Sequence, residues 1–214
     1  MSGYRLGGSG SLALAQNATF AGASGGTSTV AVPITGSYSL GTTGLLTLNA
    51  LNTFSGGTTV SSGTLTLDVP WRTFNCTNSA LGSGPLTVAA GATMIITTTA
   101  ATGDEGTSNP LGCYVSAASS SVSQITVRGT LRFPAGQVQR MPALTLDGGD
   151  LASSGALTAE STTHGVLDFD YPVTVTSSST LSAIGVVNTA VGGTPYTVAS
   201  GATLSITGYF YKGS

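Results

Sequence analysis

The sequence predicts an all-β fold built from stacked repeats, a solenoid, and three observations lead to that prediction. Threonine, valine and glycine are abundant, a composition typical of many short strands joined by tight turns. Long helical patterns of apolar residues are absent. A short unit recurs along the 214-residue chain at intervals of 19 to 39 residues, within the range that marks stacked-repeat architectures.

The recurring unit consists of a threonine, an aliphatic residue, a short turn rich in serine and glycine, and a second alternating strand. In one copy, alternation directs Val60, Leu65 and Leu67 inward and Thr64 and Thr66 outward. One rung cannot bury its own apolar row, so we expect six to seven irregular rungs stacked about 4.8 Å apart. An antiparallel sandwich is the alternative. The leading threonines, spaced by 28, 39, 19, 29 and 23 residues, are Thr59, Thr87, Thr126, Thr145, Thr174 and Thr197.

A glycine occupies the turn in most copies of the unit. We expect Gly63, Gly91, Gly129 and Gly201 to have positive φ at a tight corner between two strands. Ser178 stands at this position in one copy, so we expect that corner to differ.

The stretch from residue 44 to 97 contains two sequence blocks that belong together. The first reads Asn-Thr-Phe-Ser-Gly-Gly-Thr-Thr-Val-Ser-Ser-Gly-Thr-Leu-Thr-Leu over 52–67, and the second reads Ala-Leu-Gly-Ser-Gly-Pro-Leu-Thr-Val-Ala-Ala-Gly-Ala-Thr-Met-Ile-Ile over 80–96. They resemble the autotransporter-associated β-strand repeat of secreted bacterial surface proteins. That resemblance implies a right-handed parallel β-helix and an extracellular or cell-surface location. It leaves the activity open, because helices of this family carry adhesins, aggregation factors, proteases and plain stalks.

Charge and hydropathy exclude two classes of partner. Six lysines and arginines, scattered over the chain, cannot form the basic surface that nucleic acid requires. No run of 18 or more apolar residues is present, so we expect no transmembrane helix. Glycines and serines over 7–11 interrupt any apolar signal region. We expect one domain over 1–214, either a segment of a larger surface protein or a subunit of an assembly.

Two longer loop insertions are predicted at 68–79 and 98–123. Each follows the second strand of its own repeat in consecutive copies, so both should leave the same side of neighbouring rungs. Cys76 and Cys113, the only two cysteines, then come within bonding reach; they form either one disulfide or two separate thiols. The aromatic residues of these loops, which either contact a partner or cover an exposed edge of the helix, are Trp71, Phe74 and Tyr114.

Four carboxylates form the one acidic cluster that the sequence suggests. Asp168 and Asp170 share a strand face, and Asp147 and Asp150 lie about one rung earlier. If they stack, they resemble the acidic patch of polysaccharide-cleaving β-helices; the alternative is a solvated acidic face. No catalytic serine constellation and no metal-ligand spacing is present, so we predict no catalytic residue, no metal and no cofactor.

The aromatic tail Tyr209, Phe210 and Tyr211 is predicted to cap the last rung or to form a docking surface for another molecule. A solenoid has two open ends, and a chain with only 7% charged residues repels itself weakly. Outward threonine pairs also invite an ice-binding interpretation, but the uneven spacing of the repeats argues against a regular array.

These observations favour a structural or adhesive extracellular module, a stalk or passenger-like segment that self-assembles end to end or contacts a surface or glycan partner. A carbohydrate-binding or carbohydrate-cleaving β-helix is the second hypothesis, and ice binding is the third. We expect the chain not to be an enzyme.

Overall fold

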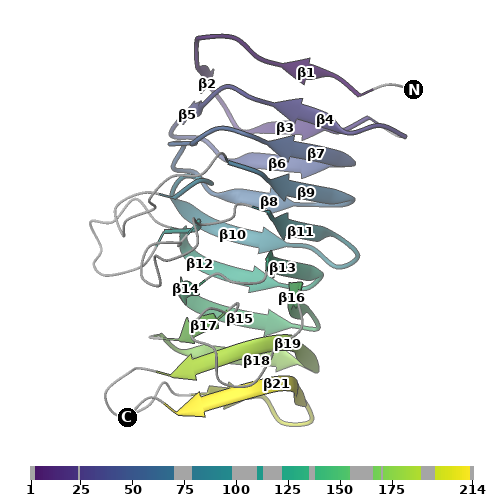
Figure 1. Cartoon of the computed structure of the whole chain (residues 1–214), viewed down its shortest axis with the longest axis vertical. Helices are drawn as coiled ribbons and strands as arrows, with labels where there is room; N and C mark the ends of the chain where they lie inside the picture. The colour runs from purple at the N-terminus through teal and green to yellow at the C-terminus, as the bar shows by residue number, and fades with distance from the viewer. Residues whose placement is uncertain are drawn as a thin grey trace.

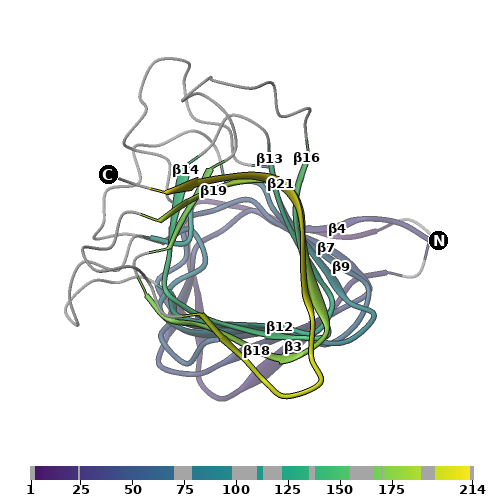
Figure 2. The ribbon, with the colours of Figure 1, turned by 90° about the horizontal axis from the view of Figure 1, so that it is seen from below.

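The computed structural model is a column of stacked strands with three faces (Figures 1 and 2). The described residues contain strands and no helix. The ranges that the structure describes are 3–23, 25–69, 79–97, 110–112, 122–134, 138–154, 166–169, 171–188 and 196–212.

Face 1 is a sheet of eight parallel strands. Each strand pairs with the strand one turn before it and the strand one turn after it. From the N-terminal end, its strands are β3 (Ala18–Ala21), β6 (Leu40–Thr43), β8 (Thr58–Val60), β10 (Gly84–Val88), β12 (Val122–Val127), β15 (Ala143–Asp147), β18 (Val173–Ser177) and β20 (Tyr196–Val198).

Face 2 follows face 1 in every turn and is also parallel throughout. Its first seven strands are β1 (Arg5–Leu6), β4 (Ser28–Val30), β7 (Leu45–Leu48), β9 (Thr64–Leu67), β11 (Thr93–Ile96), β13 (Thr130–Pro134) and β16 (Asp150–Ser154). The face ends with the first halves of two long strands, β19 (Ser179–Asn188) and β21 (Leu204–Lys212), which continue onto face 3 after a register shift.

Face 3 is regular at its two ends and irregular in the middle. It comprises β2 (Leu12–Leu14), β5 (Ile34–Gly36), β14 (Val138–Met141), β17 (Val166–Phe169) and the second halves of β19 and β21. Between β5 and β14, single backbone contacts replace strands. Asn52 bridges Leu81, and the Ala80 N–H donates to the Pro110 carbonyl at 2.8 Å.

The fold class expected from the sequence is confirmed. Viewed from the C-terminal end in Figure 2, the chain passes counter-clockwise from face 1 to face 2 to face 3 as it approaches the reader, so the β-helix is right-handed. The number of turns is larger than expected, because face 1 alone has eight strands in the described part of the chain. The first two turns escaped the repeat pattern: in β6, Gly41 takes the place of the leading threonine, and β3 carries Phe20 where later turns have an aliphatic residue.

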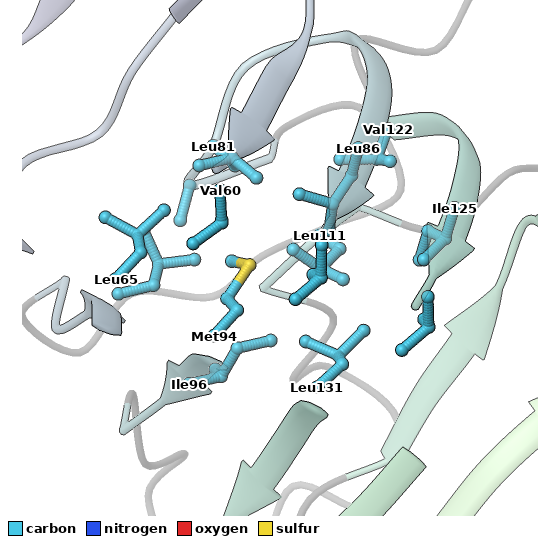
Figure 3. Close-up of a cluster of buried hydrophobic side chains, with 14 of the residues drawn as sticks. Val60, Leu65, Leu81, Leu86, Met94, Ile96, Leu111, Val122, Ile125 and Leu131 are labelled. Carbon is cyan, nitrogen blue, oxygen red and sulfur yellow. The ribbon is translucent and has the colours of Figure 1, made fainter. Parts of the chain in front are cut away.

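The core consists of inward-facing columns of aliphatic side chains (Figure 3). Each buried valine or leucine contributes about 1.5–3 kcal/mol relative to an exposed one. Alternation predicted the inward positions correctly, since Val60, Leu65 and Leu67 are fully buried. The column on face 1 contains Val60, Val88, Val127, Leu146 and Val175. The column on face 2 contains Leu46, Leu65, Met94, Leu131, Leu151 and Leu181.

In several turns, the corner between faces 1 and 2 brings the backbones of consecutive turns into close contact. A Cβ atom at Gly63 would overlap the backbone of Gly44, one turn earlier. The predicted positive φ is confirmed for Gly63, Gly91 and Gly201. For Gly129 the prediction was wrong, since its φ is not positive. Lack of space requires a glycine there instead, because a Cβ would overlap the carbonyl oxygens of two alanines of the preceding turn.

The uneven spacing of the repeat has a spatial explanation. The six leading threonines form one continuous column on face 1, each paired with the next in register: Thr59, Thr87, Thr126, Thr145, Thr174 and Thr197. The connections from face 1 to face 2 contain between one residue (Gly44) and six (22–27). Most of the extra residues are therefore inserted at the two borders of face 3, and the register of the threonine column is unaffected.

The predicted insertion 98–123 is not one continuous loop. Leu111 lies within it but is fully buried in the core, and the described segment 110–112 takes part in the irregular middle of face 3. The sequence prediction missed this return to the core because it assigned the whole stretch 98–123 to one loop, although Leu111 opens the short apolar run Leu-Gly-Cys-Tyr-Val over 111–115.

Candidate functional site

The candidate site is the irregular middle of face 3, which is flanked by the residues that precede and follow the longest connections in the sequence. The undescribed stretches 70–78 and 98–109 lie between face 2 and face 3, and 113–121 lies between face 3 and face 1. The predicted contact residues Trp71, Phe74 and Tyr114 and the two cysteines, Cys76 and Cys113, all lie outside the described residues.

The points where these stretches join the helix are described, and they are stacked on one another. Val69 and Ser79, which flank the first stretch, are both buried. Ala80 donates its N–H to the carbonyl of Pro110, which ends the second stretch. The residues just before the two predicted insertions, Leu67 and Ile96, pair with each other on face 2, which confirms that both insertions start from the same side of neighbouring turns.

Asn52 anchors the first of these turns from inside the helix. Its side-chain oxygen accepts the N–H of Ile34 at 3.0 Å, and its amide nitrogen donates to the carbonyls of Ala80 at 2.8 Å and Ala50 at 2.9 Å. The side chain is almost completely buried and thus links three consecutive turns. An internal amide supplies donors and acceptors where the strand ladder is missing.

Gln139 performs the same task one level further along. Its side-chain oxygen accepts the N–H of Leu111 at 3.2 Å, and its amide nitrogen donates to the carbonyl of Gly112 at 2.9 Å. The sequence reasoning missed both amides. Asn52 had a usable signal, because it opens the first of the two repeat blocks. Gln139 has none, since it lies in a short strand with no distinctive neighbours.

The four predicted acids do not form one described cluster. Asp147 ends β15 on face 1, Asp150 begins β16 on face 2, and Asp168 lies in β17 on face 3; Asp170 lies outside the described residues. Asp150 accepts a hydrogen bond from the Ser182 hydroxyl at 2.6 Å. Among the described residues, no group of three or more histidine, cysteine, aspartate or glutamate side chains could hold a metal ion.

Of the two acids whose side chains the structure describes, Asp147 and Asp150, Asp147 has the stronger polar environment. It accepts the Arg128 Nε–H at 2.8 Å and the Ser177 hydroxyl at 2.7 Å. These hydrogen bonds, that of Arg128 first, lower the pKa of Asp147 from 3.8 to about 2. A carboxyl that stays ionised in this way is a poor proton donor near neutral pH.

The aromatic tail forms part of the last turn. Tyr209, Phe210 and Tyr211 belong to the second half of β21, where their backbones pair with Gly185, Val186 and Val187 of β19. The tail is thus a strand of face 3 at the C-terminal end of the described helix (Figure 1).

The threonine column of face 1 is a second surface of regular chemistry. All six side chains point outward and are partly or fully exposed, and the first five lie between buried neighbours. Within the described residues, none of their hydroxyl groups has a hydrogen-bond partner. Arg128 and Asp147 lie beside this column, two positions beyond Thr126 and Thr145.

No protein-family model, no curated protein and no solved structure matches the chain. In the part of the chain that the structure describes, no helix is long and apolar enough to span a membrane.

Proposed function

We propose that this chain is an extracellular structural module, a rigid shaft that presents insertions of variable length from the borders of face 3 to a surface or glycan partner. The observation that carries the proposal is the contrast between its corners. The corner between faces 1 and 2 stays short in every turn, whereas the borders of face 3 accommodate connections of eleven residues (68–78) and thirteen (97–109). Loops on a rigid scaffold are where binding residues commonly lie.

The anchoring amides support the same proposal. Asn52 and Gln139 hold the irregular middle of face 3 through buried hydrogen bonds. A shaft that only had to be long would be served by regular strands on all three faces. The resemblance to the autotransporter repeat is consistent with a stalk or adhesive role at a cell surface.

The test replaces 70–78 or 98–109 with glycine-serine segments of equal length and measures binding to an array of immobilised glycans. Because loop-closure entropy depends mainly on length and the length is kept, we expect the circular dichroism spectrum to be unchanged. Binding should become at least tenfold weaker (about 1.4 kcal/mol). Gln124→Ala, an exposed change on face 1, is the matched control. Binding that survives both replacements contradicts the proposal, and an intact chain that binds no glycan contradicts the glycan partner.

A second candidate function is the ordering of water, as in ice binding, on the threonine column. The regular register removes the earlier objection, because the uneven sequence spacing does not disturb the column. Methyl and hydroxyl groups then repeat at the strand spacing of about 4.8 Å. Thermal hysteresis of the intact chain would support water ordering if Thr126→Lys, within the column, abolishes it and Thr66→Lys, on face 2, does not. Its absence in the intact chain would exclude it.

A further inference from the structure

The last described turn leaves the core columns uncovered. Val198 continues the face 1 column below Val175, and Ile206 continues the face 2 column below Leu181. Val175 and Leu181 are fully buried, whereas Val198 is 45% exposed and Ile206 is 40% exposed. These two side chains point inward like their predecessors, and no strand of the described residues covers them.

The first described turn has the same property at the other end. Tyr4 stacks on Ser28 and Leu6 stacks on Val30, both of which are buried. Tyr4 and Leu6 themselves are 44% and 41% exposed. Each end of the column therefore carries strand edges and inward apolar side chains that lack the next layer, a combination that favours strand addition.

The order of the faces specifies how two ends would fit together. The last described turn finishes on face 3, so the next position in the helical path lies on face 1, beyond β20. The first strand, β1, is followed by β2 and β3 in the same rotational order (Figure 1). If a second copy is rotated about the helix axis from one face to the next, its β1 lies against β20 of the first copy, and its β2 lies against the first half of β21.

The alternation of side chains agrees with this placement. In β20, Tyr196 and Val198 belong to the inward columns, and Thr197 points outward. The residues of the second copy that would lie opposite them are Tyr4 and Leu6, which point inward, and Arg5, which points outward. In the next pair, the inward residues Leu204 and Ile206 of one copy meet the inward residues of β2 in the second copy, Leu12 and Leu14. Within that second copy, Leu12 and Leu14 pair with Ile34 and Gly36 of the following turn. Parallel strand direction is preserved because both copies wind the same way.

We infer that the C-terminal end formed by β20 and β21 binds the N-terminal end of a second copy of this chain, head to tail and rotated by one face. Such a heterologous contact repeats without closing and produces filaments. The surfaces involved lie at the ends of the shaft and not along face 3. A monomeric shaft would therefore contradict this inference and leave the proposed presentation function intact.

The test uses variants that block one end each. Val198→Lys with Ile206→Lys blocks the C-terminal end, and Leu6→Lys blocks the N-terminal end. Leu45→Lys is the matched control, because Leu45 is 40% exposed on the side of the shaft. In sedimentation from about 1 µM to about 100 µM, we expect the intact chain and the control to grow with concentration and both blocked variants to stay monomeric.

Mixing the two blocked variants gives the decisive result. Each retains one functional end, so an equimolar mixture should form dimers and nothing larger. Dimers of the Leu6→Lys variant alone would indicate tail-to-tail contact and overturn the inference, as would an intact chain that remains monomeric at about 100 µM. Amide exchange of the intact chain tests the contact without any variant: protection over 204–207 should rise with protein concentration, and constant protection would contradict the inference.

Discussion

The corners of this helix differ in how much the length of their connections varies. Between faces 1 and 2, the chain turns within a few residues, and the backbone of one turn contacts the backbone of the next. At the borders of face 3, connections of very different length are accommodated, and buried amide side chains replace strand pairing. The comparison shows that a β-helix needs only one tight corner and two regular faces to keep its register, which frees the third face to vary.

A single methyl group at the tight corner should be enough to destabilise the fold. Gly63→Ala places a methyl group against the backbone of Gly44 and also forces alanine into a φ of 73°. We expect a loss of about 3 kcal/mol or more in the free energy of unfolding, because neither backbone can move without disturbing its ladder. Urea denaturation measures this loss.

Gly91→Ala is the matched control for that substitution. Its φ of 75° is nearly the same, but a Cβ there would meet nothing within 4 Å. Only the conformational cost remains, so we expect about 1–2 kcal/mol. Equal losses for the two variants would show that close backbone packing does not hold this corner.

The variable face should be broken by removing its internal amide. Asn52→Ala leaves the Ile34 N–H without its buried partner, and the Ala80 carbonyl keeps only the backbone N–H of residue 52 at 3.3 Å. We therefore expect a loss of about 2–3 kcal/mol. Asn17→Ala removes one exposed hydrogen bond to Ser39 and should cost no more than about 1 kcal/mol. Thermal unfolding of both variants compares them; an equal, small loss would mean that water replaces the Asn52 side chain.

One buried hydroxyl in the regular part should be replaceable with a gain. Thr58 is buried on face 1, and its hydroxyl has no hydrogen-bond partner. Thr58→Val has nearly the same shape, so we expect stabilisation by about 1 kcal/mol. Thr59→Val, at the neighbouring outward position, should change stability by no more than about 0.5 kcal/mol. Destabilisation by Thr58→Val would point to a bound water that the hydroxyl holds.

The smallest expected effect concerns pH. The pKa of Asp147 is about 2 in the folded chain and about 3.9 when unfolded, so the ionised carboxylate stabilises the fold above pH 4, and this contribution is lost as the pH falls from 4 to 2. Asp147→Asn should lower the melting temperature slightly at pH 6 and have no such effect at pH 2. In the presence of Arg128→Gln, the effect of Asp147→Asn on the melting temperature should differ less between pH 6 and pH 2. An effect of Asp147→Asn that is the same at both pH values would contradict the role of this ion pair.

The sequence was sufficient for the regular half of the molecule and insufficient for the rest, for physical reasons. Alternation in 64–67 identifies the inward leucines because strand periodicity is fixed at two. The repeated threonines marked equivalent positions across turns, although their spacing concealed how regular the column is. The roles of Leu111 and Gln139 were not predicted, because a core contact between two segments 28 residues apart is set by tertiary packing and carries no repeat of its own.

The unequal turns also have a mechanical consequence. In a column whose strand-to-strand hydrogen bonds run along the axis, a pull on the two ends detaches one turn at a time. Each detached turn releases its full contour length, at about 3.4 Å per residue. The turn from Thr126 to Thr145 spans 19 residues and yields about 65 Å, whereas the 39 residues from Thr87 to Thr126 yield about 130 Å. Under load the shaft would lengthen in unequal steps, and the size of each step would report which turn had opened.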